Sequence, residues 1–153
     1  MSDVGFYYEL TGSGWAEGTL QIGDARVRLT ASYLSDALGD LLRAVLAMGR
    51  GSERVRLSWI EEPAEHRWII TRENQQATVA VRRFEHWDNG IAPDAWGAVV
   101  FDATCRVEDL MLAVAQGTRQ AYLAHGVDGY RELWGEHEFP LDALGELESL
   151  AIA

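Results

Sequence analysis

The first part of the chain alternates hydrophobic and polar residues with a period of two. Phe6, Tyr8 and Leu10 alternate with more polar neighbours, and short turns at Gly12-Ser13-Gly14 and Gly23-Asp24 separate this run from two similar ones. Such alternation predicts strands, and short glycine-containing connections predict antiparallel hairpins. We therefore expect three antiparallel strands, over residues 6–11, 15–22 and 25–31.

The period then changes to 3.6. Leucine and valine side chains at positions 34, 38, 41, 42, 45 and 46 fall on one stripe, which predicts a helix. Gly49 stands where the glycine that ends a helix is usually found. We expect a helix of about four turns before this glycine.

The remaining segments add four strands and two helices. Strand patterns cover residues 54–59, 68–70, 77–81 and 98–104, and helical patterns cover residues 107–125 and 140–150. The order βββ-α-ββββ-α-α lacks the βαβ alternation of parallel sheets and predicts the α+β class. We expect a single twisted antiparallel sheet of about six to seven strands, with helices packed on one face. Residues 1–153 have the length of one domain.

Charge is distributed unevenly along the chain. Residues 1–83 carry 10 arginines and 11 acidic residues, whereas residues 84–153 carry 3 arginines and 13 acidic residues. The net charge of −11 therefore comes almost entirely from the second half, and no lysine is present. An acidic surface repels nucleic acid and anionic membranes and attracts basic proteins. We expect a basic protein partner, and neither nucleic acid nor a membrane.

The cellular compartment is predicted from two further features. Cys105 is the single cysteine, which excludes an intrachain disulfide and fits a reducing compartment. The N-terminal segment MSDVGFYYEL lacks the basic and apolar regions of a signal peptide. We expect a cytoplasmic protein.

No motif predicts catalysis, a cofactor or a metal. The glycines at positions 12, 14 and 18 lie between two strands, so they do not form a phosphate-binding loop before a helix. The four histidines lack the spacing of metal ligands. Cys105 is predicted at the start of the long helix, where its thiol is either activated or, more commonly, a small buried group. We assign no catalytic, cofactor or metal residues and favour a non-catalytic protein over an enzyme.

The candidate binding site is the segment HWDNGIAPDAWG, residues 86–97. A loop of this length in a small domain is often functional, and Trp87 and Trp96 with Asp88 and Asp94 are typical of a partner-binding surface. The alternative is that both tryptophans fold back and plug the end of the sheet.

Arginines also recur along the predicted strands. Several of them alternate with apolar residues and so share the outer face of the sheet; they are Arg26, Arg28, Arg54, Arg56, Arg67, Arg72, Arg82 and Arg83. They either bind an anionic ligand or form cross-strand pairs with Glu9, Glu17, Glu53, Glu65 and Glu73. The near balance of charge over residues 1–83 favours the pairs.

Two segments resemble known sequences. SYLSDALGDLLRAV (residues 32–45) and YRELWGEHEFP (residues 130–140) are similar to segments of small, acidic, functionally uncharacterised bacterial proteins, a domain-of-unknown-function group. The resemblance implies a bacterial protein and supplies no catalytic or ligand residues.

Three functions compete on this evidence. The first is a non-catalytic protein-interaction module with an acidic surface, such as an immunity or inhibitor protein against a basic partner. The alternative is a small-molecule-binding protein or enzyme with an aromatic-lined pocket between sheet and helices. The third is a homodimer formed through the leucine-rich C-terminal helix.

Overall fold

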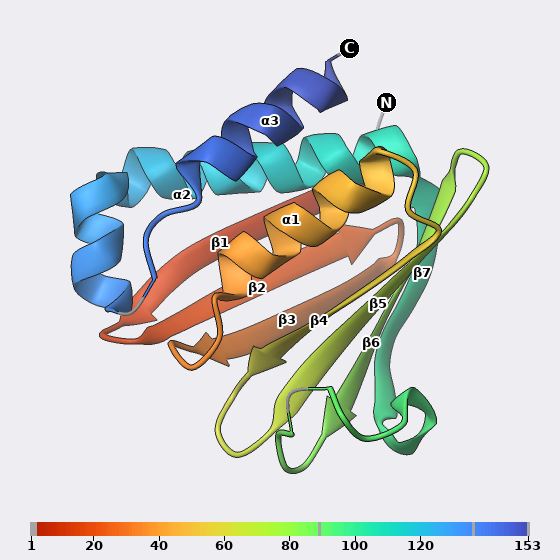
Figure 1. The fold of residues 1–153 in the computed structure, drawn as a ribbon, viewed down its shortest axis with the longest axis horizontal. Helices are drawn as coiled ribbons and strands as arrows, with labels where there is room; N and C mark the ends of the chain where they lie inside the picture. The colour runs from red at the N-terminus through yellow and green to blue at the C-terminus, as the bar shows by residue number, and fades with distance from the viewer. Residues whose placement is uncertain (1–2, 89, 136, 153) are drawn as a thin grey trace.

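The computed structural model describes residues 3–88, 90–135 and 137–152, and over these residues seven strands form two antiparallel sheets (Figure 1). The first sheet has the order β1-β2-β3, with β1 (Val4–Gly12), β2 (Trp15–Ile22) and β3 (Ala25–Ser32). The second has the order β4-β5-β6-β7, with β4 (Arg54–Ile60), β5 (Glu65–Glu73), β6 (Gln76–Phe84) and β7 (Ala98–Arg106).

The predicted α+β class and antiparallel pairing are confirmed, but the single sheet is divided in two. Each ladder joins two strands that are consecutive in the chain and connected by a turn or a loop. Strands β3 and β4 are also consecutive, but helix α1 (Ala37–Gly49) lies between them and no ladder joins them. Strand β3 contacts both β4 and β7, the edge strands of the second sheet, without entering a ladder with either. The second sheet therefore curves around β3.

Three helices lie together along one side of the sheets (Figure 1). Helix α1 presents a buried stripe, including Leu38, Leu41 and Val45, that confirms the predicted period of 3.6, but Leu34 precedes the helix and is exposed. Helix α3 (Leu141–Ala151) packs against both α1 and α2 (Val107–Trp134). Arg119 of α2 and Glu148 of α3 form a bidentate ion pair that ties these two helices together.

Helix α2 is broken at Gly126, whose φ of 69° and ψ of 174° are not helical. The helix predicted over residues 107–125 therefore ends where expected, and a second helical segment follows it. The Leu133 carbonyl oxygen in this segment accepts a 2.7 Å hydrogen bond from Gly14 N in the β1–β2 turn. Tyr130 and Trp134 are buried in the core. The break thus returns the chain to the end of the first sheet.

Trp59 of β4 joins the two sheets and α1. Its side chain is fully buried, and its Nε1 donates a 2.9 Å hydrogen bond to the Ala37 carbonyl oxygen at the start of α1. A Cβ atom built on Gly18 of β2 would lie 2.5 Å from the Trp59 ring. Glycine at this position is therefore required for the first sheet to approach the second.

The leucines of α3 serve the fold. Leu144 and Leu147 are completely buried, whereas Leu141 is partly exposed. Most of the leucine surface of α3, which suggested a homodimer contact, is therefore buried within this chain. No helix of the described residues has the length and apolar character needed to cross a membrane.

Candidate functional site

The segment 86–97 connects β6 to β7 and folds over the outer face of the second sheet, at the end of the molecule away from α2 and α3 (Figure 1). It contains one short 3-10 turn, η1 (Asp94–Trp96). Asn89 lies outside the described residues. Hydrogen bonds and ion pairs from strands β4, β5 and β6 hold the segment in place.

Arg67 of β5 is the centre of this attachment. Its side chain is 1% exposed, and its Nη1 donates to the Ala92 carbonyl oxygen at 2.5 Å and to Asp94 Oδ1 at 2.9 Å. Its Nε donates to Glu65 Oε2 at 3.1 Å, and the guanidinium lies 4.0 Å from the centroid of the Phe84 ring. A buried charge is tolerated when it is paired and hydrogen-bonded in this way. Burial of Arg67 therefore depends on the loop.

Asp94 accepts hydrogen bonds from three arginines. Besides Arg67, Arg54 Nη2 donates to Oδ2 at 2.6 Å and Arg56 Nη2 donates to Oδ1 at 2.7 Å. Burial by itself raises the pKa of the Asp94 carboxyl, but the hydrogen bonds and positive charges of Arg56 and Arg67 outweigh burial and lower it below its ordinary value. Asp94 is thus ionised and clamped between two strands.

Asp88 shapes the loop from within. Its Oδ1 accepts a 3.0 Å hydrogen bond from Ile91 N and its Oδ2 accepts a 2.9 Å bond from Ala92 N. Its own N–H donates to the buried Glu65 carboxylate at 3.1 Å. Desolvation by itself raises the pKa of the Asp88 carboxyl. The backbone hydrogen bonds and the positive charge of Arg67 outweigh desolvation, so the pKa lies below its ordinary value. Both loop aspartates are therefore engaged by groups of this protein.

The apolar side chains of the loop point to solvent. Trp87 is 43% exposed, Trp96 is 77% exposed and Ile91 is 84% exposed. The alternative in which both tryptophans plug the sheet is thus wrong for Trp96. The reason is that Phe84 fills this space: a Cβ atom on Gly97 would lie 2.6 Å from the Phe84 ring.

Ile91 was not singled out by the sequence. It lies between a glycine and an alanine in the middle of a loop that carries four polar residues, and no periodicity marks it. In the structure its backbone N–H donates to the Asp88 carboxylate, and its side chain is exposed. The one feature of the sequence that could have indicated Ile91 is an apolar residue in a polar loop that also carries two tryptophans.

The acidic surface lies elsewhere. Helices α2 and α3 carry the arginines Arg119 and Arg131, each paired with a glutamate. Their acidic side chains are more numerous: Glu108, Asp109, Asp128, Glu132, Asp142, Glu146 and Glu148. Around the loop, by contrast, the acidic groups are matched by arginines of the sheet. The predicted site combined apolar and acidic character, whereas in the structure the loop keeps exposed apolar side chains and its acidic groups are neutralised by arginines.

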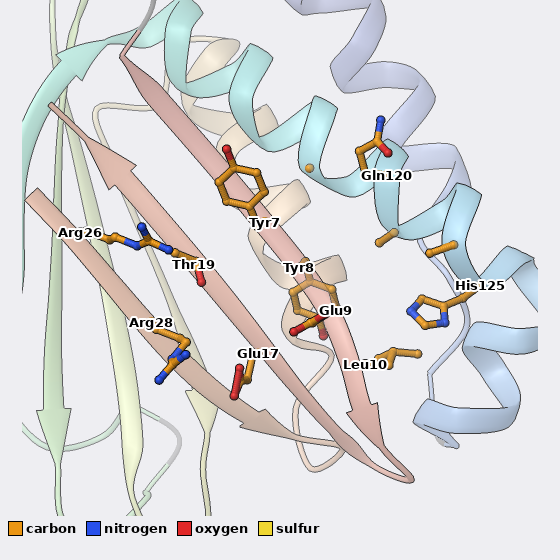
Figure 2. Close-up of a pocket in the computed structure, with 13 residues that line it drawn as sticks. Tyr7, Tyr8, Glu9, Leu10, Glu17, Thr19, Arg26, Arg28, Gln120 and His125 are labelled. Atoms are coloured by element: carbon orange, nitrogen blue, oxygen red, sulfur yellow. The ribbon is translucent and has the colours of Figure 1, made fainter.

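A groove of about 630 Å³ lies on the solvent-facing side of the first sheet, and α2 forms one of its walls (Figure 2). Its floor is built by side chains of all three strands, among them Tyr7, Glu17 and Arg28. His125 of α2 lines the same groove and is half-buried. The groove borders α2 but lies on the exposed face of the sheet, and its lining is largely charged and polar, so it differs from the aromatic-lined pocket between sheet and helices that the sequence raised as an alternative.

Two further arginines of the second sheet pair with groups other than those expected. Arg72 donates to the Met48 carbonyl oxygen at the end of α1, at 2.8 Å, and Arg82 donates to the Gly97 carbonyl oxygen at 2.9 Å. Of the predicted cross-strand glutamates, Glu65 alone among the described residues forms an arginine pair, with Arg67 of the same strand. The arginines therefore mainly hold loops and a helix end in place.

Cys105 is buried, and its thiol is held in the protonated form. Cys105 lies in β7 rather than in a helix, and burial, followed by the nearby Asp109 and Asp3 charges, raises the pKa of its thiol to about 12. The hypothesis of an activated thiol is therefore wrong. Within residues 3–88, 90–135 and 137–152, no group of three or more His, Cys, Asp or Glu side chains could hold a metal ion.

Comparison with known proteins gives one structural likeness. No protein-family model matches the chain and no curated protein matches it, which is consistent with the resemblance to uncharacterised proteins. Among solved structures, the CdiA-CT/CdiI toxin and immunity complex from Enterobacter cloacae is similar, with a TM-score of 0.47 and 10% identical residues. The match covers 76% of this chain and 99% of that chain. A likeness of this extent establishes neither a shared family nor a shared function.

Proposed function

We propose that this protein is a non-catalytic interaction module that binds a protein partner through the loop 86–97. The observation that carries the proposal is the exposure of Trp96 and Ile91 on a loop whose backbone is fixed by the buried Arg67. Tryptophan is one of the residue types enriched among the side chains that dominate binding energy. One exposed apolar side chain on a protein surface needs no explanation. Three on the same loop, Trp87, Ile91 and Trp96, indicate a binding surface.

Rigidity of the loop supports the same function. Binding costs free energy for every loop and side chain that becomes ordered, and a loop already held in place avoids most of that cost. Asp88 and Asp94 bind backbone and arginine groups of the protein itself. In this proposal they position Trp87, Ile91 and Trp96 for the partner and do not themselves carry its affinity.

The net charge of −11 favours a basic partner. Because the surplus of carboxylates is on α2 and α3, the charge acts at long range on the approach of the partner, and the loop supplies short-range apolar contacts. An immunity or inhibitor protein that covers a basic toxin or enzyme is one form of such a module. Steering by charge raises the association rate and weakens with salt.

Affinity capture with matched variants tests this function. Wild-type protein and the variant Ile91→Ala/Trp96→Ala are used as bait, and any captured protein is purified and titrated against each. We expect the variant to lose at least tenfold in affinity with an unchanged melting temperature. Leu123→Ala, which removes an exposed side chain of α2, is the control and should bind like wild type. Equal binding by the loop variant would contradict the proposal.

A second candidate function is small-molecule binding in the groove between the first sheet and α2. The observation that favours it is the volume of this groove, about 630 Å³, which is within the size range of ligand sites. A metabolite that raises the melting temperature in proportion to the logarithm of its concentration would support it. No shift across a broad metabolite panel would argue against it.

A further inference from the structure

Two arginines of β3 differ from every other arginine that the structure describes. Eleven arginines each have a hydrogen bond or an ion pair within the protein. Arg26 and Arg28 have neither, although they are two residues apart on the same exposed face. We call them the arginine pair. Adjacent unpaired guanidinium groups repel each other and present donors suited to a carboxylate or phosphate.

A second unpaired set of charges faces the same groove. Glu9 of β1 and Glu17 of β2 are directly opposite each other in the β1–β2 ladder and have no basic partner among the described residues. Like charges placed directly across a ladder destabilise a sheet. We call these two residues the glutamate pair. In Figure 2 their carboxylates lie on the same side of the sheet as the guanidinium groups of the arginine pair.

The ladder register fixes how far apart the two pairs are. Glu17 pairs with Thr30 of β3, so Arg28 lies diagonally across from it. The arginine pair is one strand away from Glu17 and two strands away from Glu9. Since strands are about 4.8 Å apart and residues rise about 3.4 Å along a strand, the backbone positions of the two pairs are separated by roughly 8 Å (Arg28 to Glu17) to about 17 Å (Arg26 to Glu9).

We propose that this groove binds a small zwitterionic molecule whose anionic group contacts the arginine pair and whose cationic group contacts the glutamate pair. A ligand with only a negative charge would meet the repulsion of the glutamates, and one with only a positive charge would meet that of the arginines. The shortest separation, between Arg28 and Glu17, matches a basic amino acid, and the longer ones match a short peptide. The inference rests on the second candidate function and is independent of the loop 86–97.

The walls of the groove suit such a ligand. Tyr7 is 64% exposed and lies two residues before Glu9 on the same face of β1, so its ring offers an aromatic surface to a cationic group. On the other side, α2 contributes the small residues Gly117, Ala121 and Ala124. Their size leaves room for the uncharged part of the ligand between the helix and the sheet.

The test is an NMR titration of amide signals with L-arginine, L-lysine and triglycine. Acetate and methylammonium, each carrying one of the two charges, are the controls. We expect saturable shifts at residues 7–9, 17–19 and 26–28 for at least one zwitterion, with at least tenfold weaker binding of both controls. Saturable binding of acetate alone with equal affinity would overturn the zwitterion assignment. Shifts confined to other residues, or no shifts with any probe, would overturn the site.

Two double variants separate a built site from general surface charge. Arg26→Gln/Arg28→Gln and Glu9→Gln/Glu17→Gln should each weaken binding of the zwitterion at least tenfold. Because the replaced side chains are at the surface, both variants should fold, and the second should melt at a higher temperature than wild type once the like charges are removed. Undiminished binding by both variants would overturn the proposal. If a zwitterion raises the melting temperature of the wild-type protein but shifts no amide signal of the groove, the protein binds a small molecule elsewhere. That result would reject this site while leaving the second candidate function standing.

Discussion

Arg67 of β5 and Asp94 of the loop are 27 residues apart in the chain, and their charged groups meet at 2.9 Å. Arg67 is buried, and the same aspartate also accepts hydrogen bonds from Arg54 and Arg56 on β4. One loop carboxylate thus neutralises arginines from two neighbouring strands. The conformation of the loop and the stability of the sheet are therefore linked.

Replacing Arg67 by methionine should strongly destabilise the protein. The change leaves the buried Glu65 carboxylate without its cation, and breaking a buried ion pair from one side costs about 3–5 kcal/mol. Urea unfolding would measure the loss in free energy of unfolding. The control is Arg54→Met, because Arg54 is largely exposed and contacts the same Asp94. Its loss should stay within about 1 kcal/mol, and equal losses for both variants would contradict a buried network.

Stability should fall in acid partly through Asp94. The folded protein holds the pKa of Asp94 below its ordinary value of 3.8, so the ionised form is favoured on folding. This contribution is fully present above about pH 5 and is lost as pH falls below 3.8 toward the folded-state pKa. Unfolding free energies measured between pH 7 and pH 3 should decline less steeply for Asp94→Asn than for wild type. Parallel curves for the two proteins would exclude Asp94 as a source of the decline.

Asp88→Ala should loosen the loop while preserving the sheets. The Asp88 carboxylate accepts the amide protons of Ile91 and Ala92, and removing such an acceptor leaves these protons open to water. Hydrogen exchange at residues 91 and 92 should become at least tenfold faster, with amides of β5 and β6 unchanged. Unchanged exchange at residues 91 and 92 would show that Asp88 does not hold this turn.

Gly117→Ala should separate α2 from the first sheet. A Cβ atom at this position would lie 2.2 Å from the Phe6 carbonyl oxygen of β1, and backbone cannot give way as a flexible side chain does. Overpacking of this kind costs about 1–3 kcal/mol. Gly145→Ala in α3 is the matched control because no atom lies near its Cβ position, and it should stabilise by about 0.5–1 kcal/mol. A stable Gly117→Ala protein would mean that α2 can shift freely.

The Cys105 thiol should resist alkylation in the native state. Its pKa of about 12 and its burial leave almost no thiolate at pH 8. Iodoacetamide should modify the native protein at least a hundredfold more slowly than the protein unfolded in urea. Comparable rates would mean that β7 opens readily.

The regular elements were predictable because local periodicity determines them. The alternation at Phe6 and Tyr8 and the leucine stripe of α1 need no knowledge of distant residues. The division into two sheets could not be predicted in this way. It depends on the absence of a ladder between β3 and β4, which the residues of neither strand encode by themselves.

The candidate site was predictable only in outline. Length and composition identified the loop, but Asp88 and Asp94 read equally well as exposed groups or as partners of arginines. Their role follows from Arg67, which the ladder register places between Ser58 and Arg82 and beneath the loop. The arginine pair could not be told apart from the other arginines in the sequence. What distinguishes it is that every other arginine has a hydrogen-bond or ion-pair partner in the structure, and most of these partners come from distant parts of the chain.

The placement of charge also determines how the molecule would be oriented. With surplus carboxylates on α2 and α3 and arginine-rich strands under the loop 86–97, the protein has a permanent electric dipole running from one end to the other. Near a cationic surface this dipole favours orientations in which α2 and α3 face that surface. In the proposed interaction through the loop 86–97, the net charge would therefore raise the encounter rate with a basic partner without turning the loop toward it.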